Sequence, residues 1–361
     1  MPQRPVIVVE DDPFTRLIEV VLDPRTAAER HAAFADFCAH DEPDFAGWCE
    51  RVRGSVPELY PAEVRLVSSP EELRARLPGA VALVVESFQV GRAELAAADR
   101  LAVVQKYGLI TRNIDAAACA ARNMKILTLR RRANIACAEH AFALMLALAK
   151  KLHRIHGLIS AEQLEAAGYS PRAFDRRHTA SSNWARIGGL KMLYASTLGI
   201  IGLGEIGREV ALRAAAFGMR VLYYQRNRLA PADEQHWHAH YVALDILLAQ
   251  SNWVVVQLPA GPATCSLIDG TRLAQMKRGA SLINVSRAEI VERTALIDAL
   301  ASGHLGGCAL DPLYEEPGRS DDELLRFENV ILTPHTAAQP RFNALNDIEE
   351  LIVGLARALA P

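Results

Sequence analysis

Short apolar runs alternate with longer, partly polar segments along the first third of the chain. The runs are rich in valine and too short for helices, which is typical of strands buried in a parallel sheet. They lie at residues 6–9, 64–67, 80–85 and 101–105, with helical patterns at 71–77 and 93–98. Strands that alternate with helices predict a parallel α/β domain. Residues 23–60 contain two helical stretches separated by the sequence DEPD, and the pattern alone does not place them.

A long apolar segment follows this region. After a strand at residues 126–129, we expect a helix over 135–155 with Asn134 as its N-cap. Its middle is apolar on nearly every face, which predicts burial either in a domain core or in a dimer interface. Ser160 and Gln163 have capping-box spacing. The polar stretch at 172–189 is expected to be a loop or an arm.

The rest of the chain repeats the strand–helix alternation and predicts a doubly wound sheet. A final helix over 343–359 is expected to return to the first domain. We therefore expect one domain formed by residues 1–111 plus 337–361 and another formed by 112–336. The expected strands lie at 197–201, 220–224, 252–258, 280–285, 307–310 and 330–333, and helices at 205–217, 244–249, 269–276 and 293–302.

The sequence GLGEIG, residues 202–207, stands between a buried strand and a helix. Gly202 permits a tight turn, Gly204 lets the backbone approach a pyrophosphate, and Gly207 lets the helix pack closely on the strand. Free N–H groups at the helix start then face the phosphates. This context predicts a dinucleotide site. The alternative, a glycine pattern that arose by chance in an ordinary turn, does not explain the flanking strand and helix.

Composition narrows the class of protein further. The 361 residues carry a formal charge of −2, which gives no indication of binding to nucleic acid or to an anionic membrane. We found no signal-peptide pattern and no apolar run of spanning length, and we expect a cytoplasmic protein without a membrane partner. The six scattered cysteines are expected to be reduced and mostly buried. The HWHAH segment, residues 236–240, is interpreted as a solvated connection, so no metal site is expected.

Three polar residues follow predicted strands of the second sheet, where ligands of such sheets bind. They are Arg287, Glu316 and His335. A guanidinium can hold a carboxylate with two hydrogen bonds, an imidazolium can donate a proton to a carbonyl oxygen, and a carboxylate can orient the imidazole. These three side chains together could catalyse the reduction of a carbonyl group next to a carboxylate. The residues alone do not decide between Glu316 and its neighbour Glu315.

With these residues in place, the chain resembles the D-isomer-specific 2-hydroxyacid dehydrogenase family. Five blocks match in order between residues 100 and 340: QKYGLITRNIDAAACAARNMKIL, NIACAEHAFALMLALAKK, TLGIIGLGEIG, MKRGASLINVSRAEIVERTALIDAL with ALDPLYEEP, and NVILTPH. The resemblance implies a Rossmann-type dinucleotide domain and a flavodoxin-like α/β substrate domain. We also expect a homodimer, in which the apolar helix at 135–155 could be buried. It also implies hydride transfer between a nicotinamide cofactor and a small 2-hydroxy or 2-keto acid, with Arg287 on the carboxylate, His335 as general acid/base and Glu316 as its partner.

The resemblance also indicates the remaining site residues. The implied cofactor contacts are Gly202, Gly204, Glu205, Ile206, Gly207, Gln225, Arg226, Arg228, Pro259 and Asp311, and the implied substrate contacts are Tyr107, Gly108, Leu109, Arg112 and Arg131. The substrate loop departs from the family pattern GxGxDNID, with Ile110 at a glycine position and Arg112 at an acidic one. Residues 130–132 are arginines where a proline is common, Ala288 replaces a glycine, and Pro312 replaces a valine. These departures favour an unusual substrate. The arginine run is either a solvated loop or a source of positive charge at the cleft between the domains.

The strand at 220–224 is followed by Gln225, Arg226 and Arg228 and lacks the acid that binds the ribose of NAD. This predicts NADP in preference to NAD; the alternative is that Gln225 binds the ribose and both cofactors serve. A different class of function also stays open at this point, a dinucleotide-sensing binding protein of the same fold, like the corepressor relatives of the family.

Overall fold

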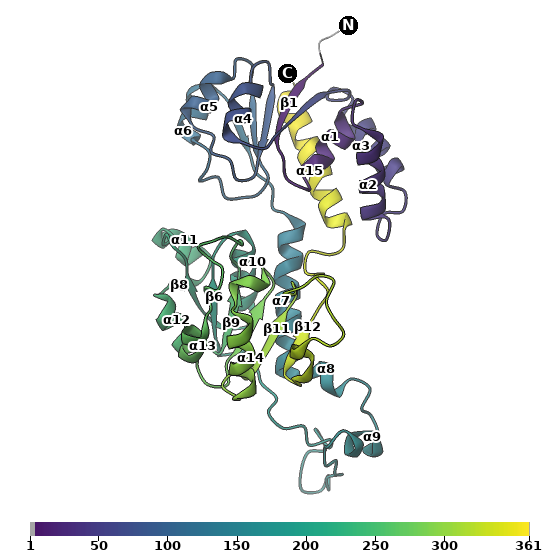
Figure 1. Cartoon of the computed structure of the whole chain (residues 1–361), viewed down its shortest axis with the longest axis vertical. Helices are drawn as coiled ribbons and strands as arrows, with labels where there is room; N and C mark the ends of the chain where they lie inside the picture. The colour runs from purple at the N-terminus through teal and green to yellow at the C-terminus, as the bar shows by residue number, and fades with distance from the viewer. Residues whose placement is uncertain (1–3, 361) are drawn as a thin grey trace. The chain divides into compact units, whose positions relative to one another are not determined.

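The computed structural model describes residues 4–360 and separates them into two compact units (Figure 1). The first unit comprises the chain up to Ala136 together with the segment from Ala338 onward, and the second comprises Cys137–Ala337. Each unit is built on its own parallel sheet.

The first unit contains a five-stranded sheet in the order β2-β1-β3-β4-β5. All neighbouring strands are parallel. This order is that of the flavodoxin-like fold and confirms the expected architecture. The strands are β1 (Val6–Glu10), β2 (Glu63–Val67), β3 (Ala82–Val85), β4 (Val103–Lys106) and β5 (Lys125–Leu127).

Helices cover both faces of this sheet because successive residues of a buried strand point to opposite sides. Ile7 and Val9 of β1 belong to one core cluster, and Val6 and Val8 belong to the other. The first cluster is covered by α1 (Arg16–Leu22), α2 (Ala28–Cys38), α3 (Phe45–Ser55) and α15 (Phe342–Leu359), and the second by α4 (Pro70–Arg76), α5 (Arg92–Ala97) and α6 (Ala116–Ala121). Thus α2 and α3 account for the two helical stretches that the sequence pattern left unplaced.

The first unit extends beyond the expected boundary at residue 111. Residues 112–136 belong to it because β5 pairs with β4, with Val103 opposite Lys125. The C-terminal helix α15 also belongs to this unit, as expected, and appears in yellow beside α1 in Figure 1. The expectation that the second domain starts at 112 is therefore wrong, because the pairing of β5 with β4 keeps this segment in the first sheet.

The second unit contains a seven-stranded parallel sheet in the order β12-β11-β10-β9-β6-β7-β8. The order reverses between β6 and β9, which gives the crevice where doubly wound sheets bind ligands. This arrangement confirms the Rossmann-type fold. The strands are β6 (Thr197–Ile201), β7 (Arg220–Tyr224), β8 (Ala239–Tyr241), β9 (Trp253–Val256), β10 (Ser281–Asn284), β11 (Gly307–Leu310) and β12 (Val330–Leu332).

Helices connect these strands. Leucines of the helices at 244–250, 270–275 and 293–301 fill one core cluster together with the sheet. The sequence pattern missed β8, the short edge strand that begins inside the HWHAH segment. Among residues 4–360 no group of three His, Cys, Asp or Glu side chains is placed to hold a metal ion. The helices are α8 (Leu152–Ile155), α9 (Ala161–Ala166), α10 (Glu205–Ala216), α11 (Pro231–His236), α12 (Leu244–Gln250), α13 (Gly270–Gln275) and α14 (Arg293–Ala301), with short 3-10 turns at Ala288–Ile290 and Glu323–Arg326.

The long helix α7 (Arg132–Lys150) begins two residues before Asn134, so Asn134 is not its N-cap. The buried carboxylate of Asp347, in α15, instead accepts the backbone N–H of Arg132 at 3.0 and 2.9 Å. It satisfies a donor that a helix start leaves without an intrahelical partner. Within the described residues only α7 is long and apolar enough to cross a membrane, but 56% of that stretch is buried inside the protein. Such burial is typical of a core helix of a globular protein.

Two smaller expectations are confirmed. Ser160 and Gln163 form a reciprocal capping box at the start of α9. All six cysteines are free, and five of them are buried.

The long helix expected to continue to residue 155 is interrupted at Lys151, whose φ is +55°, and α8 follows as a separate turn.

Candidate active site

The glycine loop after β6 has the geometry of a dinucleotide cradle. Gly202 has a φ of +100°, and a Cβ added there would lie 2.3 Å from the carbonyl oxygen of Gln257. A Cβ on Gly207 would lie 2.2 Å from the carbonyl oxygen of Gly202. Both positions therefore require glycine, one for the turn and one for the close packing of helix on strand.

Gly204 differs from these two glycines. A Cβ added to Gly204 would meet no atom within 4 Å, although the residue is the N-cap of the twelve-residue helix α10. The fold therefore does not need a glycine here for its own packing. The open space beside the backbone at a helix N-terminus fits a pyrophosphate. Glu205 and Ile206, the next two residues, are half-buried in the first turn of the helix.

The end of β7, where the ribose of a dinucleotide is recognised, is occupied by a hydrogen-bonded turn. Oε1 of Gln225 accepts the backbone N–H of Leu203 at 3.2 Å, and its Nε2 donates to the carbonyl oxygen of Asn227 at 2.6 Å. Gln225 thus ties the strand end to the glycine loop. Arg226 is exposed and forms no hydrogen bond or ion pair within residues 4–360. Arg228 instead has a carboxylate partner, Glu234.

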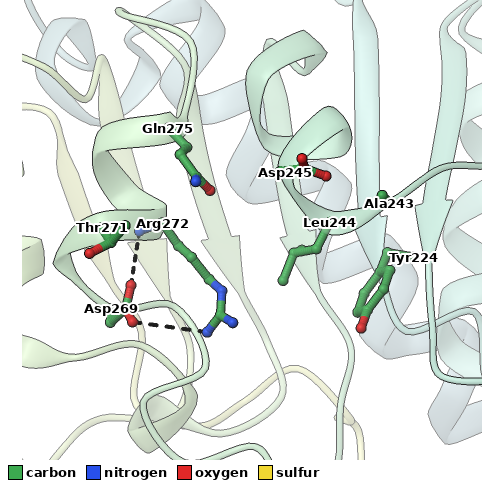
Figure 2. A pocket seen from close by; sticks show the side chains of 8 residues that line it. All are labelled: Tyr224, Ala243, Leu244, Asp245, Asp269, Thr271, Arg272 and Gln275. Atoms are coloured by element: carbon green, nitrogen blue, oxygen red, sulfur yellow. Dashed lines mark hydrogen bonds and ion pairs between the residues drawn. The ribbon is translucent and has the colours of Figure 1, made fainter.

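A pocket of about 510 Å³ adjoins the same strand end (Figure 2). Tyr224 lies on one side of it, and Asp269, Thr271 and Arg272 lie on the other. Asp269 caps α13 by accepting the backbone N–H of Arg272 at 2.9 Å. None of Arg287, Glu316 and His335 lines this pocket. Pro259, which follows β9, is exposed, and its carbonyl oxygen accepts the hydroxyl of Thr264.

The three residues expected to carry the chemistry follow three neighbouring strands, β10, β11 and β12. Nδ1 of His335 lies 2.9 Å from Oε2 of Glu316, so the structure pairs this carboxylate, and not that of Glu315, with the imidazole. The hydrogen bond with His335 lowers the pKa of Glu316 below its usual value. Oε1 of Glu316 also accepts the backbone N–H of Leu313 at 2.9 Å, which orients the carboxylate. The pair leaves Nε2 of His335 available for proton transfer.

Arg287 is exposed and lies just beyond β10. Its Nη1 donates to the carbonyl oxygen of Ser286 at 2.7 Å. The side chain of the buried residue Asn284 holds this turn, because it accepts from the backbone and hydroxyl of Ser286 and donates to the carbonyl oxygen of Arg287. Sequence reasoning missed Asn284, whose only signal was a polar residue at the end of an apolar strand.

Asp311, expected to contact the cofactor, is completely buried. Its carboxylate accepts hydrogen bonds from the hydroxyl of Thr333 at 2.7 Å and from the backbone N–H groups of Thr336 and Ala337 at 2.8 and 2.9 Å. Nε2 of His140 lies 3.3 Å from the same carboxylate. Burial by itself raises the pKa of Asp311, but the hydrogen bonds from His140, Thr333 and the two N–H groups outweigh it and lower the pKa to about 2. The side chain therefore presents no surface to a cofactor and holds the loop that carries His335.

His140 is a second residue that sequence reasoning missed. It projects from the long helix α7, and its Nε2 also lies 3.1 Å from the hydroxyl of Thr333. The signal in the sequence was a histidine within an otherwise apolar helix. Only the fold shows that this helix passes beside the loop after β12.

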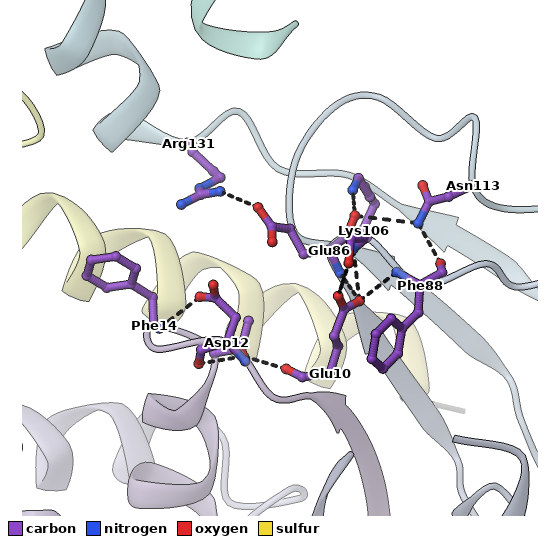
Figure 3. Close-up of polar contacts among 10 residues, drawn as sticks. Glu10, Asp12, Phe14, Glu86, Phe88, Lys106, Asn113 and Arg131 are labelled. Carbon is purple, nitrogen blue, oxygen red and sulfur yellow. Dashed lines mark hydrogen bonds and ion pairs between the residues drawn. The ribbon is translucent and has the colours of Figure 1, made fainter. Parts of the chain in front are cut away.

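The expected substrate residues lie in the first unit. Figure 3 shows one of them, Arg131, together with polar groups at the carboxyl ends of the strands of this unit. The carboxylate of Glu10 accepts the backbone N–H groups of Glu86, Ser87 and Phe88 at 2.7 to 3.0 Å. Lys106 donates to the carbonyl oxygen of Glu86. These bonds fix the turn after β3, against which the loop formed by residues 107–113 rests.

Arg131 is held on one side of that loop. Its guanidinium lies 4.1 Å from the centroid of the Tyr107 ring, and Nη1 lies 3.2 Å from Oε1 of Glu86. Burial raises the pKa of Glu86, and the charge of Arg131 opposes this shift only in part. Tyr107 itself is buried, whereas Leu109 and Arg112 are exposed. Gly108 has a φ of +150°.

The arginines at 130–132 differ in their contacts. Arg132 forms ion pairs with Asp347 at 2.9 Å and Glu350 at 2.8 Å, both in α15, so it holds the start of α7 against the C-terminal helix. Arg131 packs on Tyr107, and Arg130 is exposed. Neither of the two interpretations of this run therefore describes all three arginines.

Together these features define a nucleotide-binding Rossmann domain that carries a histidine–carboxylate pair on the strands next to its switch point. Comparison with known proteins agrees with this class. The profile of the family described as D-isomer specific 2-hydroxyacid dehydrogenase, NAD binding domain, matches residues 142–337. The chain belongs to the D-isomer-specific 2-hydroxyacid dehydrogenase family, and its second unit supplies the site for a nicotinamide cofactor.

Individual relatives are consistent with this assignment. The chain is 34% identical to the D-3-phosphoglycerate dehydrogenase of Mycobacterium leprae over 83% of its own length, but it spans only about half of that relative, 54%. It is 34% identical to the glyoxylate reductase of Pyrococcus furiosus over 71% of each chain. The solved structure of D-mandelate dehydrogenase from Rhodotorula graminis superposes with a TM-score of 0.56, at 23% identity and with 98% and 93% of the two chains covered, which supports the fold.

Proposed function

We propose that this protein is a nicotinamide-dependent oxidoreductase that interconverts a small 2-keto acid and the corresponding 2-hydroxy acid. The observation that carries the proposal is the 2.9 Å contact between His335 and Glu316 on the same sheet as a glycine loop shaped for a dinucleotide. A protein that only sensed the cofactor would have no need of an imidazole oriented by a carboxylate. The corepressor-like alternative is for this reason the weaker one.

The residues of the chain divide the task as follows. Arg287 binds the substrate carboxylate through two hydrogen bonds and draws electron density from the neighbouring carbonyl. Protonated His335 donates its proton to the carbonyl oxygen, and neutral His335 removes it in the reverse direction. Glu316 holds the imidazole in one orientation and stabilises its charged form. A nicotinamide cofactor, when bound, would supply a hydride to the carbonyl carbon in the reduction or take one from the hydroxyl-bearing carbon in the oxidation. Asp311 and Asn284 position the loops that carry His335 and Arg287.

The finer features of the proposal concern cofactor and substrate. NADPH is the preferred cofactor, because no carboxylate follows β7 directly and Arg226 is exposed there. Gly202, Gly204 and Gly207, with the first turn of α10, bind the pyrophosphate. Tyr107, Gly108, Leu109, Arg112 and Arg131 form the substrate side of the first unit. The exposed Arg112 favours a keto acid with a second anionic or a bulky polar group.

A homodimer in the cytoplasm is the proposed state of the protein. The segment between α7 and β6 exposes several large apolar side chains, which favours contact with a second copy. They include Leu152, Ile159, Met192 and Tyr194. Light scattering coupled to gel filtration tests this assignment, and a mass of one chain at micromolar concentration would contradict it.

A panel of 2-keto acids with NADPH and NADH tests the proposed activity. Loss of absorbance of the reduced cofactor, together with the 2-hydroxy acid as product, is the expected result with at least one substrate. A protein that binds the cofactor but turns over no keto acid of the panel would instead support the sensing function.

A further inference from the structure

We propose that Glu234 is a cofactor-specificity residue, which retains the guanidinium of Arg228 and so limits how strongly the site favours NADPH over NADH. This inference rests on the proposed use of a nicotinamide cofactor, and it names a residue that the sequence motif does not indicate. Glu234 lies ten positions beyond the end of β7, in the first turn of α11.

The contact between the two side chains is a two-pronged ion pair. Nε and Nη2 of Arg228 lie 2.8 Å from Oε1 and Oε2 of Glu234, respectively. The guanidinium also lies 5.6 Å from the centroid of the Tyr241 ring. This geometry uses one edge of the planar fork, the arrangement by which arginine also holds a phosphate. A 2′-phosphate must therefore compete with Glu234 for Arg228.

Glu234 is not a mobile surface carboxylate. Its Oε1 accepts the hydroxyl of Tyr223, a residue of β7 itself, at 2.8 Å. The same hydroxyl accepts the backbone N–H of Leu229 at 2.9 Å. The carboxylate side chain is only 12% exposed, whereas that of Arg228 is 59% exposed. The strand, the turn and α11 thus hold a negative charge beside the strand end.

The charges at this strand end explain the expected effect. Sequence reasoning counted two guanidiniums, Arg226 and Arg228, and no acid. The structure adds the carboxylate of Glu234, which neutralises Arg228 and leaves Arg226 as the arginine of this pair without an ion-pair partner among residues 4–360. A fixed carboxylate near the ribose repels a 2′-phosphate but not a 2′-hydroxyl. The site therefore discriminates less between the two cofactors than two arginines alone would.

Calorimetric titration with 2′-phospho-ADP-ribose and with ADP-ribose tests the inference without requiring turnover. Glu234→Gln keeps the shape of the side chain and an acceptor for Tyr223 but removes the charge. We expect it to lower the Kd for 2′-phospho-ADP-ribose by about tenfold, the order of magnitude for one unit charge near a phosphate at a hydrated site. The Kd for ADP-ribose should change less than about twofold.

A charge control and two further variants isolate the ion pair. Asp233→Asn makes the same charge change one residue earlier on α11, where the side chain is exposed and makes no ion pair within the described chain, and it should leave the ratio of the two Kd values unchanged. Arg228→Gln, which leaves Glu234 without its cation, should raise the Kd for 2′-phospho-ADP-ribose. In the double variant Glu234→Gln/Arg228→Gln, the decrease in Kd for 2′-phospho-ADP-ribose that Glu234→Gln causes should disappear. The guanidinium that Glu234→Gln would free is absent from this variant.

The outcomes distinguish a failure of the proposed nucleotide site from a failure of the role assigned to Glu234. If the wild-type protein binds neither ligand, the nucleotide site of the proposed function is wrong. If it binds ADP-ribose but Glu234→Gln and Arg228→Gln both leave the ratio unchanged, or Asp233→Asn changes it as much as Glu234→Gln, only the assignment of Glu234 is overturned. Opposite shifts in the two single variants would establish it even if one variant were less stable.

Discussion

The backbone N–H of His335 donates a hydrogen bond to the carbonyl oxygen of Asp311 over 3.0 Å. His335 has a φ of +54°, a left-handed conformation that residues other than glycine seldom adopt. The carboxylate of the same Asp311 accepts the next two backbone N–H groups, those of Thr336 and Ala337. One buried residue thereby holds the loop that directs the imidazole toward Glu316.

The buried Asp311 should make stability depend on pH in the acid range. Its pKa is about 2 in the folded protein and 3.8 ordinarily, so its ionised form stabilises the fold above pH ~4. That contribution, about 2 kcal/mol, is lost as the pH falls from ~4 to ~2. We expect the free energy of unfolding, measured with urea, to fall less between pH 7 and pH 3 in Asp311→Asn than in the wild type. The exposed Asp298→Asn serves as the control, and an equal loss in all three proteins would contradict the role of Asp311.

Replacement of His335 by alanine should reduce turnover by ~10²–10⁴, the usual contribution of a general acid. Cofactor binding should stay nearly unchanged, because the glycine loop follows a different strand, β6. Steady-state rates and a fluorescence titration with NADPH measure the two effects separately. A variant that keeps most of its activity would remove His335 from the mechanism.

Arg287→Lys should also be severely impaired, although it retains the charge. A lysine ammonium cannot reproduce the planar, two-pronged contact with a carboxylate. We expect kcat/KM to fall by at least about a hundredfold, the order of magnitude for loss of a charged hydrogen-bonded contact of 2–3 kcal/mol or more. Arg278→Lys, an exposed arginine before β10, is a matched control. A small effect on both kcat and KM would place Arg287 outside the site.

The two glycines of the cradle should respond differently to alanine. Gly202→Ala forces a Cβ to within 2.3 Å of the Gln257 carbonyl oxygen at a φ of +100°, so it should lower the melting temperature. Gly204→Ala meets open space in the protein, so it should fold with nearly unchanged stability and yet bind the dinucleotide at least about tenfold more weakly. Thermal melts and dinucleotide titrations distinguish the two. Unchanged affinity in folded Gly204→Ala would contradict the proposed position of the pyrophosphate.

Arg112 should influence the choice of substrate. It is exposed in the loop that the family uses for the substrate and stands where an acid is usual. Arg112→Ala should lower kcat/KM for dicarboxylic keto acids by about tenfold more than for monocarboxylic ones, as expected for one lost charge contact. Arg92→Ala, exposed on α5, controls for net charge. Equal ratios of the two substrate classes in wild type and Arg112→Ala would refute the prediction.

Local patterns were sufficient for much of the fold. Buried strands of a parallel sheet are continuous apolar runs, so the five strands of the first sheet and six of the seven strands of the second sheet could be predicted from short apolar segments. The glycine loop could be predicted because its backbone demands are met by residue type alone. His335, Glu316 and Arg287 were visible because each closely follows a strand, and the ends of parallel strands meet at one edge.

The remaining features depend on contacts between residues far apart in the sequence. The sequence does not show that Glu234 contacts Arg228 and Tyr223. The positive charge expected from the sequence at the end of β7 was therefore too large. It also does not show that His140 and Thr333 surround Asp311, or that Asp347 caps α7 in place of Asn134. Strand pairing of β5, a tertiary interaction, moved the boundary of the first unit to Ala136. The sequence alone therefore determined most of the elements, the family and the candidate site residues, whereas the tertiary structure decided which charges are paired, because pairing depends on distances that no local pattern contains.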